Sequence, residues 1–257
     1  NGNETARRQD VLTVEFLDVG QANAALLTCG GKSLLIDGGN VADGAKVTRA
    51  VRTVTDRLDY VVNTHGHEDH VGGLPAVVDA VPVGQAIVSP VTTDSEYYRD
   101  FVDALADRGV TPVAGQAGMQ FSLGDAKCTL LGPTAAGSDL NNSSLVLQVR
   151  FGGATFLFMG DAGAEEERSL IQSGADVSCD VLAVGHHGSD SATGYVFLRQ
   201  ALPKYAVISV GAGNRYGHPA ESTLSRLRDA GCTVYRTDQS GTITIVTDKN
   251  GKIRCPA

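Results

Sequence analysis

The sequence has no tryptophan, only two methionines, and no apolar run near the roughly 20 residues that a membrane helix needs. The longest apolar runs, such as residues 154–159, stop far short of that length. Hydrophobic residues make up 42% and charged residues 19%, which is close to ordinary globular usage and favours neither a disordered nor a fibrous chain. At 257 residues the chain can bury a sizeable core. These features predict a folded protein without a transmembrane segment.

Positive charge is scarce. Lys and Arg number 21 against 29 Asp and Glu, which gives a formal net charge of −8. This balance argues against a basic nucleic-acid-binding surface, because phosphate contacts depend on Lys and Arg that displace counterions. A metal site could still bind phosphate locally, since divalent ions supply positive charge themselves. A nucleic-acid substrate is therefore disfavoured but not excluded.

The five cysteines have no CxxC spacing, which argues against a structural zinc knuckle. Their odd number leaves at least one thiol unpaired within the chain. A disulfide between Cys232 and Cys255 and a set of buried free thiols are both open interpretations.

The first ten residues are polar, and we expect 1–10 to be a flexible segment before one domain over 11–257. Asn1 stands where a Met would begin a nascent chain, which suggests processing. Export to the extracellular side or the cell surface is the expectation from this feature, and a cytoplasmic location is the alternative.

Two stretches of the sequence repeat one pattern, in which a glycine-closed hairpin is followed by alternating helices and strands. The expected segments are strands over 24–29, 32–37 and 58–63 with a helix over 45–57, and then strands over 144–151, 154–159 and 181–184 with a helix over 165–173. This repetition favours an α/β fold made of two similar halves packed together.

Three imidazoles and two carboxylates occupy the six positions from His65 to His70. Buried together without a cation, they would impose a desolvation cost and, when protonated, mutual repulsion. A divalent metal removes both costs by binding the nitrogen lone pairs. His65 and His67 alternate and face one side, whereas Asp69 and His70 lie on the next turn and can reach a second ion. The density of ligands disfavours the alternative, a solvated polar loop.

All six histidines lie in three short polar segments, of which the others are His186–His187 and His218. Asp161 follows the apolar run 156–159, so its carboxylate is expected at the end of a buried strand, where it could bridge two cations. The alternative for Asp161 is a helix N-cap, and the two roles are compatible.

Taken together, His65-x-His67-x-Asp69-His70, the Asp37-Gly38-Gly39 turn, Gly160-Asp161 and the later histidines resemble the metallo-β-lactamase superfamily. The resemblance covers nearly the whole chain from about residue 11. Within the superfamily, the chain is most similar to the metallo-β-lactamase-like domain of the DNA-uptake protein ComEC. The segments that carry this narrower resemblance are FLDVGQ at 16–21, NSSLV at 142–146, GHHGS at 185–189 and NRYGHP at 214–219.

The resemblance implies a four-layer αββα sandwich with two divalent metal ions, zinc or manganese, in a groove between the sheet edges. It implies the following ligands: His65 and His67 for the first ion, Asp69 and His70 for the second, and Asp161 between them. His186, at the end of its strand, is our choice for the remaining ligand of the second ion, and the assignment among His186, His187 and His218 stays open. The superfamily's third histidine of the first site is absent, because the matching stretch reads Asn141-Asn142-Ser143. Either an asparagine carbonyl takes its place or the first site is weaker, which keeps both metals open.

By the same resemblance, the protein is expected to be a phosphodiesterase or nuclease that uses a metal-activated hydroxide. Single-stranded DNA is one candidate substrate, and the oligomeric state is not determined. From the site itself we expect that Asp69 orients the hydroxide and that His187 or His218 protonates the leaving oxygen. Asn142, Ser143 and Ser189 are expected to contact the substrate, and a turn-capping role is the alternative for Asn142 and Ser189.

Two alternatives remain. The first is hydrolysis of a carbonyl substrate such as a lactone, a thioester or a β-lactam. The missing third histidine and the absence of tryptophan disfavour the β-lactam. The second is a non-catalytic binding module, which the full set of acidic and imidazole side chains disfavours.

Overall fold

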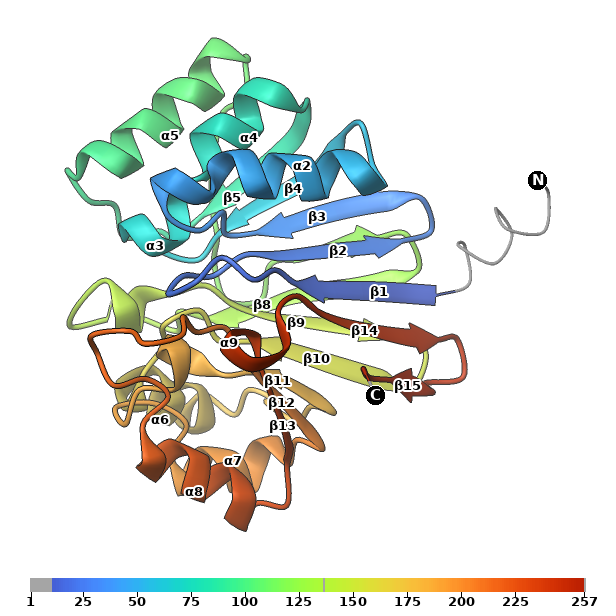
Figure 1. Ribbon diagram of the computed structural model, residues 1–257, viewed down its shortest axis with the longest axis vertical. Helices are drawn as coiled ribbons and strands as arrows, with labels where there is room; N and C mark the ends of the chain where they lie inside the picture. The colour runs from blue at the N-terminus through green and yellow to red at the C-terminus, as the bar shows by residue number, and fades with distance from the viewer. Residues whose placement is uncertain (1–10, 136, 257) are drawn as a thin grey trace.

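The computed structural model describes residues 11–135 and 137–256. The expected flexibility of residues 1–10 therefore falls outside the described residues. Two β-sheets lie at the centre of the molecule, and helices cover their outer sides (Figure 1). The predicted αββα sandwich is confirmed.

The first sheet combines the strands of the amino-terminal half with two strands from the end of the chain. Its strands are β1 (Val11–Phe16), β2 (Ala25–Cys29), β3 (Lys32–Ile36), β4 (Leu58–Asn63), β5 (Val83–Val88), β6 (Val113–Ala114), β14 (Ile243–Asp248) and β15 (Ile253–Arg254). They lie in the order β15-β14-β1-β2-β3-β4-β5-β6. Pairing is antiparallel from β15 to β3 and parallel from β3 to β6.

The second sheet repeats this design. Its strands are β7 (Gln120–Leu123), β8 (Ala126–Gly132), β9 (Val146–Phe151), β10 (Ala154–Phe158), β11 (Val181–Ala183), β12 (Tyr205–Ile208) and β13 (Thr233–Arg236), in the order β13-β12-β11-β10-β9-β8-β7. Pairing is antiparallel from β7 to β10 and parallel from β10 to β13. Because the carboxyl ends of parallel strands meet at one edge of a sheet, their following loops gather there.

Helices cover the outer face of each sheet (Figure 1). Over the first sheet lie α2 (Gly44–Val54), α3 (Glu68–Val71), α4 (Leu74–Ala80) and α5 (Glu96–Asp107). Over the second lie α6 (Ala164–Gln172), α7 (Tyr195–Ala201) and α8 (Glu221–Asp229), and the short α9 (Thr237–Ser240) follows β13. Three 3-10 turns, η1 (Val41–Asp43), η2 (Asn141–Ser143) and η3 (Gly185–Gly188), lie in the connecting loops.

The largest apolar cluster lies between the two sheets and takes side chains from both. Phe16 of β1 stacks on Phe158 at the end of β10, with ring centroids 5.8 Å apart. Separate clusters join each sheet to its own helices, so every sheet is buried on both faces. Apolar burial on this scale provides the main driving force for folding.

The five cysteines are all free in the structure. Cys29, Cys128 and Cys179 are buried, whereas Cys232 and Cys255 are half-buried and not bridged. Of the two interpretations left open by the sequence, the structure therefore contains free thiols and not the Cys232–Cys255 disulfide. In the described residues, no helix is long and apolar enough to span a bilayer.

The inter-sheet core gives a stability prediction at Phe156, which is fully buried on β10. Replacing Phe156 by Ala should lower the free energy of unfolding by about 3–5 kcal/mol, because it removes a large apolar side chain and leaves a cavity. Urea unfolding measures the change. Val196→Ala, at a position that is 63% exposed, is the control and should change stability little. Equal effects of the two substitutions would contradict this account of the core.

Candidate metal centre

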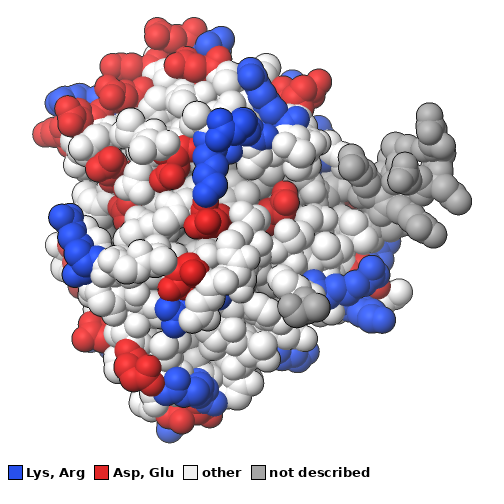
Figure 2. Space-filling model, viewed as in Figure 1, with Lys and Arg blue, Asp and Glu red and all other residues white. Residues whose placement is uncertain are grey.

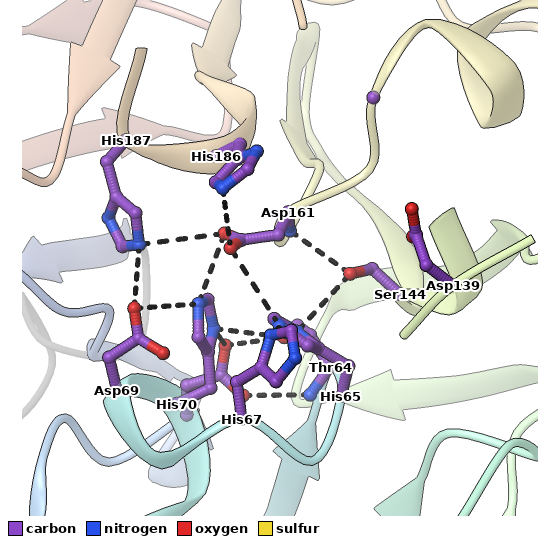
Figure 3. A network of polar contacts seen from close by, with 12 residues as sticks. Thr64, His65, His67, Asp69, His70, Asp139, Ser144, Asp161, His186 and His187 are labelled. Atoms are coloured by element: carbon purple, nitrogen blue, oxygen red, sulfur yellow. Dashed lines mark hydrogen bonds and ion pairs between the residues drawn. The ribbon is translucent and has the colours of Figure 1, made fainter. Parts of the chain in front are cut away.

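The predicted ligands converge where the loops after several strands meet (Figure 3). His65 and His67 follow β4, and Asp69 and His70 lie on α3. The second sheet contributes the other members, Asp161 after β10 and His186–His187 on η3 after β11. Segments that follow strands of both sheets thus contribute to one polar cluster.

One group of possible ligand atoms consists of His65, His67 and Asp161, whose atoms lie within 4.8 Å of one another. The Nε2 atom of His65 lies 3.0 Å from His67 Nδ1 and 3.8 Å from Asp161 Oδ2. Its other nitrogen, Nδ1, contacts the hydroxyls of Thr64 and Ser144 at 3.2 and 3.3 Å. Burial, reinforced by the nearby charge of His70, holds the pKa of His65 well below its ordinary value. His65 is therefore neutral, the form that binds metals.

A second group consists of Asp69, His70, Asp161 and His187. His70 Nε2 lies 3.1 Å from Asp161 Oδ1, and His187 Nε2 lies 3.1 Å from Asp69 Oδ2. His187 Nδ1 lies 2.9 Å from the carbonyl oxygen of Ser209. Because a carbonyl can only accept, Nδ1 carries the proton, and the lone pair of neutral His187 is on Nε2. The nitrogen that faces the cluster is thus the one that can bind a metal.

His70 is oriented in the same way by the buried carboxylate of Asp37. Asp37 Oδ2 lies 2.7 Å from His70 Nδ1, and Asp37 also accepts hydrogen bonds from the Thr64 main chain, the Thr64 hydroxyl and the Asn63 amide. The carboxylate keeps a proton on Nδ1 and turns Nε2 toward the cluster. A second layer of this kind fixes the ring and increases its basicity toward a metal.

Two buried atoms at the centre of the cluster show that the residues present fit a cation. His70 Nε2 and Asp161 Oδ1 lie 3.1 Å apart as an ion pair, but neither atom forms a hydrogen bond with any described residue. Leaving a buried polar atom unsatisfied costs about 1–3 kcal/mol. A divalent ion would satisfy both atoms, and the nitrogen and oxygen donors suit zinc or manganese.

The ionisation states of the buried carboxylates and imidazoles also favour a cation in the cluster. Burial alone would raise the pKa of Asp161, but the charges of His70 and His187 hold it well below its ordinary value. Burial opposes the charge of His70 as well, yet Asp161 and Asp37 hold its pKa well above the ordinary value. For Asp69, the neighbouring histidines outweigh burial and lower the pKa to about 2. In the metal-free protein, the ionised carboxylates of Asp69 and Asp161 therefore lie beside a His70 ring that retains its extra proton.

The cluster opens into a groove with about 500 Å³ of space. The residues that line it come from both sheets and are Gln21, Asn40, His67, Glu68, Asp69, Asn141, Asp161, His186, His187, Arg215, Tyr216 and His218. Burial, then the nearby imidazoles of His186 and His187, lower the pKa of His218.

The family model of the metallo-beta-lactamase superfamily matches residues 17–212. The chain belongs to this superfamily. Its relatives include ComE operon protein 3 of Bacillus subtilis, 34% identical over 73% of this chain and 24% of that protein. Competence protein ComA of Neisseria gonorrhoeae is 33% identical over 93% of this chain and 33% of that protein. The predicted ComEC-type resemblance is confirmed, and the chain spans about a quarter to a third of the length of these relatives.

The fold comparison agrees. The metallo-beta-lactamase fold protein YhfI from Bacillus subtilis has a TM-score of 0.63 to this chain at 13% identity, over 96% of this chain and 100% of that one. At such low identity this likeness concerns the fold alone. The chain is thus a metallo-beta-lactamase superfamily hydrolase with competence-protein relatives and a candidate metal-binding cluster.

The structure differs from the sequence prediction in which of the two adjacent histidines belongs to the second ligand group. It places His187, not His186, in the second ligand group. Both residues have positive φ, 50° and 53°, so the chain turns sharply and directs the second ring at the cluster. His186 Nε2 lies 3.7 Å from Asp161 Oδ2, the oxygen that faces His65. The metal-binding roles themselves remain predictions.

The three predicted substrate contacts, Asn142, Ser143 and Ser189, do not line the groove. Asn142 Oδ1 accepts hydrogen bonds from main-chain nitrogens at the start of α6. Ser143 donates to the Asp139 carbonyl, and the Ser189 hydroxyl contacts the Ser191 hydroxyl. These side chains support the loops around the site, and their predicted contact with substrate has no geometric support.

Their neighbour Asn141 does line the groove, and its Oδ1 is buried without a partner among the described residues. This residue lies in the stretch that replaces the third histidine, as the sequence comparison indicated. Sequence reasoning gave no role to Asn40, Arg215, Tyr216 or Gln21. Three of them could have been found because they lie in the segments that carry the family resemblance: Gln21 in FLDVGQ, and Arg215 and Tyr216 in NRYGHP.

Replacing Asp37 by Asn should weaken metal binding about 10- to 100-fold, the usual effect of losing a residue that orients a metal ligand. With the amide oxygen directed at the Thr64 nitrogen, the amide nitrogen would donate to His70 Nδ1 and leave the proton on Nε2, where it blocks a metal. Titration of metal-free protein with zinc or manganese, followed by calorimetry, measures the affinity.

The matched control is Asp59→Asn, because Asp59 also accepts a main-chain hydrogen bond, from Ser33, but at the other end of β4. This variant should bind metal like the unchanged protein. Equal metal affinity in the Asp37 variant would contradict the orienting role.

Proposed function

We propose that this protein is a metal-dependent phosphodiesterase that cleaves a nucleic-acid strand, with single-stranded DNA as the leading candidate. The observation that carries the proposal is the pair of ligand groups that share Asp161. A shared carboxylate between two groups suits a binuclear site, and two neighbouring divalent ions are a recurrent arrangement in phosphodiester-cleaving enzymes. The two ions and their identity as zinc or manganese belong to the proposal.

When bound, divalent ions would lower the pKa of a water molecule and stabilise negative charge on phosphoryl oxygens. His65 and His67 would hold one ion, His70, His187 and Asp69 the other, and Asp161 would contact both. The site residues supply the orientation. The Asp69 side chain is 30% exposed, and its pKa of about 2 keeps it ionised, so it can accept a hydrogen bond from water in the groove. It cannot serve as an acid near neutral pH.

The groove also offers contacts for a substrate larger than one phosphate. Of the described residues that line it, Arg215 is the only lysine or arginine. Its guanidinium lies 5.0 Å from the centre of the Tyr216 ring, and Tyr216 is 57% exposed. Arginine pairs with phosphate and aromatic rings stack on bases, which is how proteins bind single strands without a broad basic surface.

The charge distribution supports a short or flexible strand rather than a long duplex. Figure 2 shows Lys and Arg interspersed with Asp and Glu on one face of the molecule, without a continuous basic field on that face. With a net charge of −8, affinity must come from the ions and a few local contacts. One relative is named a competence protein, which supports a DNA substrate.

The proposal is tested with metal-free protein reconstituted with zinc, manganese or magnesium, on single-stranded DNA and on bis-p-nitrophenyl phosphate. Turnover should require an added ion. Asp161→Ala should lower kcat/KM at least about 100-fold, because it removes the carboxylate that both ligand groups share. Asp229→Ala changes an exposed carboxylate that bonds Tyr195 and should match the unchanged protein. Metal binding without turnover on either substrate would refute the proposal and redirect the search to thioesters, lactones and β-lactams.

Arg215→Gln should raise KM for a DNA oligonucleotide about 10-fold, which corresponds to one charge-assisted hydrogen bond. The increase should be smaller for bis-p-nitrophenyl phosphate, which has no flanking phosphate. Steady-state kinetics on both substrates measures the difference, with Arg199→Gln on α7 as the control. An equal change on both substrates would show that Arg215 does not bind the strand.

A further inference from the structure

His218 lies on the wall of the groove and is held by a residue from the opposite sheet. Gln21 follows β1, whereas His218 follows β12, 197 positions later in the chain. The two loops touch so closely that a Cβ placed on Gly211 would lie 2.6 Å from the Gln21 nitrogen. Gln21 therefore has a fixed position relative to the His218 loop.

The orientation of the Gln21 amide follows from one hydrogen bond. The main-chain nitrogen of Gly211 donates to Gln21 Oε1 at 3.1 Å. Because a main-chain N–H can only donate, the amide oxygen must face Gly211, and the NH₂ group must face the other way. That NH₂ group lies 3.4 Å from His218 Nδ1. An amide NH₂ can only donate, so His218 Nδ1 must accept.

A ring nitrogen that accepts a hydrogen bond carries no proton. Neutral His218 therefore has its proton on Nε2. The positively charged imidazolium is disfavoured as well, since its Nδ1–H would oppose the NH₂ group. Within the described part of the chain, no group forms a hydrogen bond with Nε2, which leaves this N–H available in the groove.

The main chain around His218 is equally constrained. Asn214 Oδ1 accepts from the main-chain nitrogens of Tyr216 and His218, at 3.1 and 3.0 Å. Its Nδ2 donates to the carbonyl oxygens of Gly211 and His218. Asn214 thus fixes the loop, and Gln21 fixes the ring that the loop carries. The His218 ring also stacks against the Tyr216 ring, with centroids 5.7 Å apart.

We propose that Gln21 is a positioning residue that holds His218 neutral with its proton on Nε2, so that His218 donates a hydrogen bond to a phosphoryl oxygen of the substrate. This role rests on the proposed phosphodiesterase function. It differs from the sequence expectation that His218 protonates the leaving oxygen, because a neutral imidazole is far too weak an acid for that step. A neutral histidine that donates a hydrogen bond stabilises developing negative charge without proton transfer.

The assignment is tested by NMR of protein labelled with ¹⁵N-histidine and loaded with zinc or magnesium, both of which are diamagnetic. The His218 signals are identified by their absence in His218→Gln. We expect a protonated Nε2 and an unprotonated Nδ1 at neutral pH. In Gln21→Glu, both carboxylate oxygens accept, so Nδ1 should gain a proton. Gln116→Glu adds the same charge at an exposed position outside the groove lining, and should leave His218 unchanged.

Three NMR results would overturn the proposal. These are a proton on Nδ1 in the unchanged protein, the absence of a proton on Nε2, and no change of Nδ1 in Gln21→Glu. The first two need no variant, so the test does not depend on how a substitution folds.

A kinetic experiment tests the hydrogen-bond role. The amide of His218→Gln can donate a hydrogen bond but cannot act as an acid, so this variant should keep about 10-fold more kcat than His218→Ala. Equal losses in the two variants would overturn the role. If the unchanged protein cleaves no phosphodiester, the proposed function and the hydrogen-bond role fail together, while the NMR result still decides the proton's position.

Discussion

The buried carboxylate of Asp161 is the group on which the whole site depends. It follows β10 of the second sheet, yet it faces His65 and His70 from the first. Its main-chain nitrogen donates to the Ser144 hydroxyl, which also contacts His65. An ionised carboxylate that is only 2% exposed would be costly to bury alone. The surrounding imidazoles make that burial tolerable, and the imidazoles in turn require the carboxylate.

Close packing of the loops explains the glycines beside the ligands. A Cβ on Gly73 would lie 2.0 Å from the carbonyl oxygen of Gly38, and one on Gly160 would lie 2.9 Å from the Thr64 side chain. Gly160 also has a φ of 55°, in the left-handed region that favours glycine. The glycines of the Asp37-Gly38-Gly39 and Gly160-Asp161 motifs thus allow backbones to approach where the ligands must converge. Non-glycine residues with positive φ gather there too, at Asp37, His186 and His187.

Much of the fold could be predicted from the sequence because its signals are local. Hairpins over 24–37 and 144–159 were indicated by apolar runs around glycine pairs, and β2, β3, β9 and β10 form there. The helix expected over 45–57 is α2, which ends at Val54 because Thr55 is extended. The first four ligands lie within six positions of one another, so their proximity was already present in the chain.

The rest of the site depends on contacts that no local pattern contains. Which of His186 and His187 enters the cluster is decided by two consecutive positive φ angles, and a pair of adjacent histidines gives no hint of them. Asn142 lies in the stretch that the resemblance matches to the superfamily's third histidine ligand. In the fold, however, its amide oxygen accepts a hydrogen bond at the start of α6, which is distant in the sequence. The contact between Gln21 and His218 joins opposite sheets and needs the folded loops before it exists.

The origin of the ligands in both sheets has a consequence for the stability of the molecule. Four of the ligands lie in the segment that follows β4 of the first sheet: His65, His67, Asp69 and His70. Asp161 and His187 follow β10 and β11 of the second sheet. An ion in either group would therefore act as a cross-link between the two layers at the edge where the apolar core ends. Ion binding adds to the free energy of unfolding in proportion to the logarithm of ion concentration over Kd. The resistance of the sandwich to opening is thus coupled to the availability of metal.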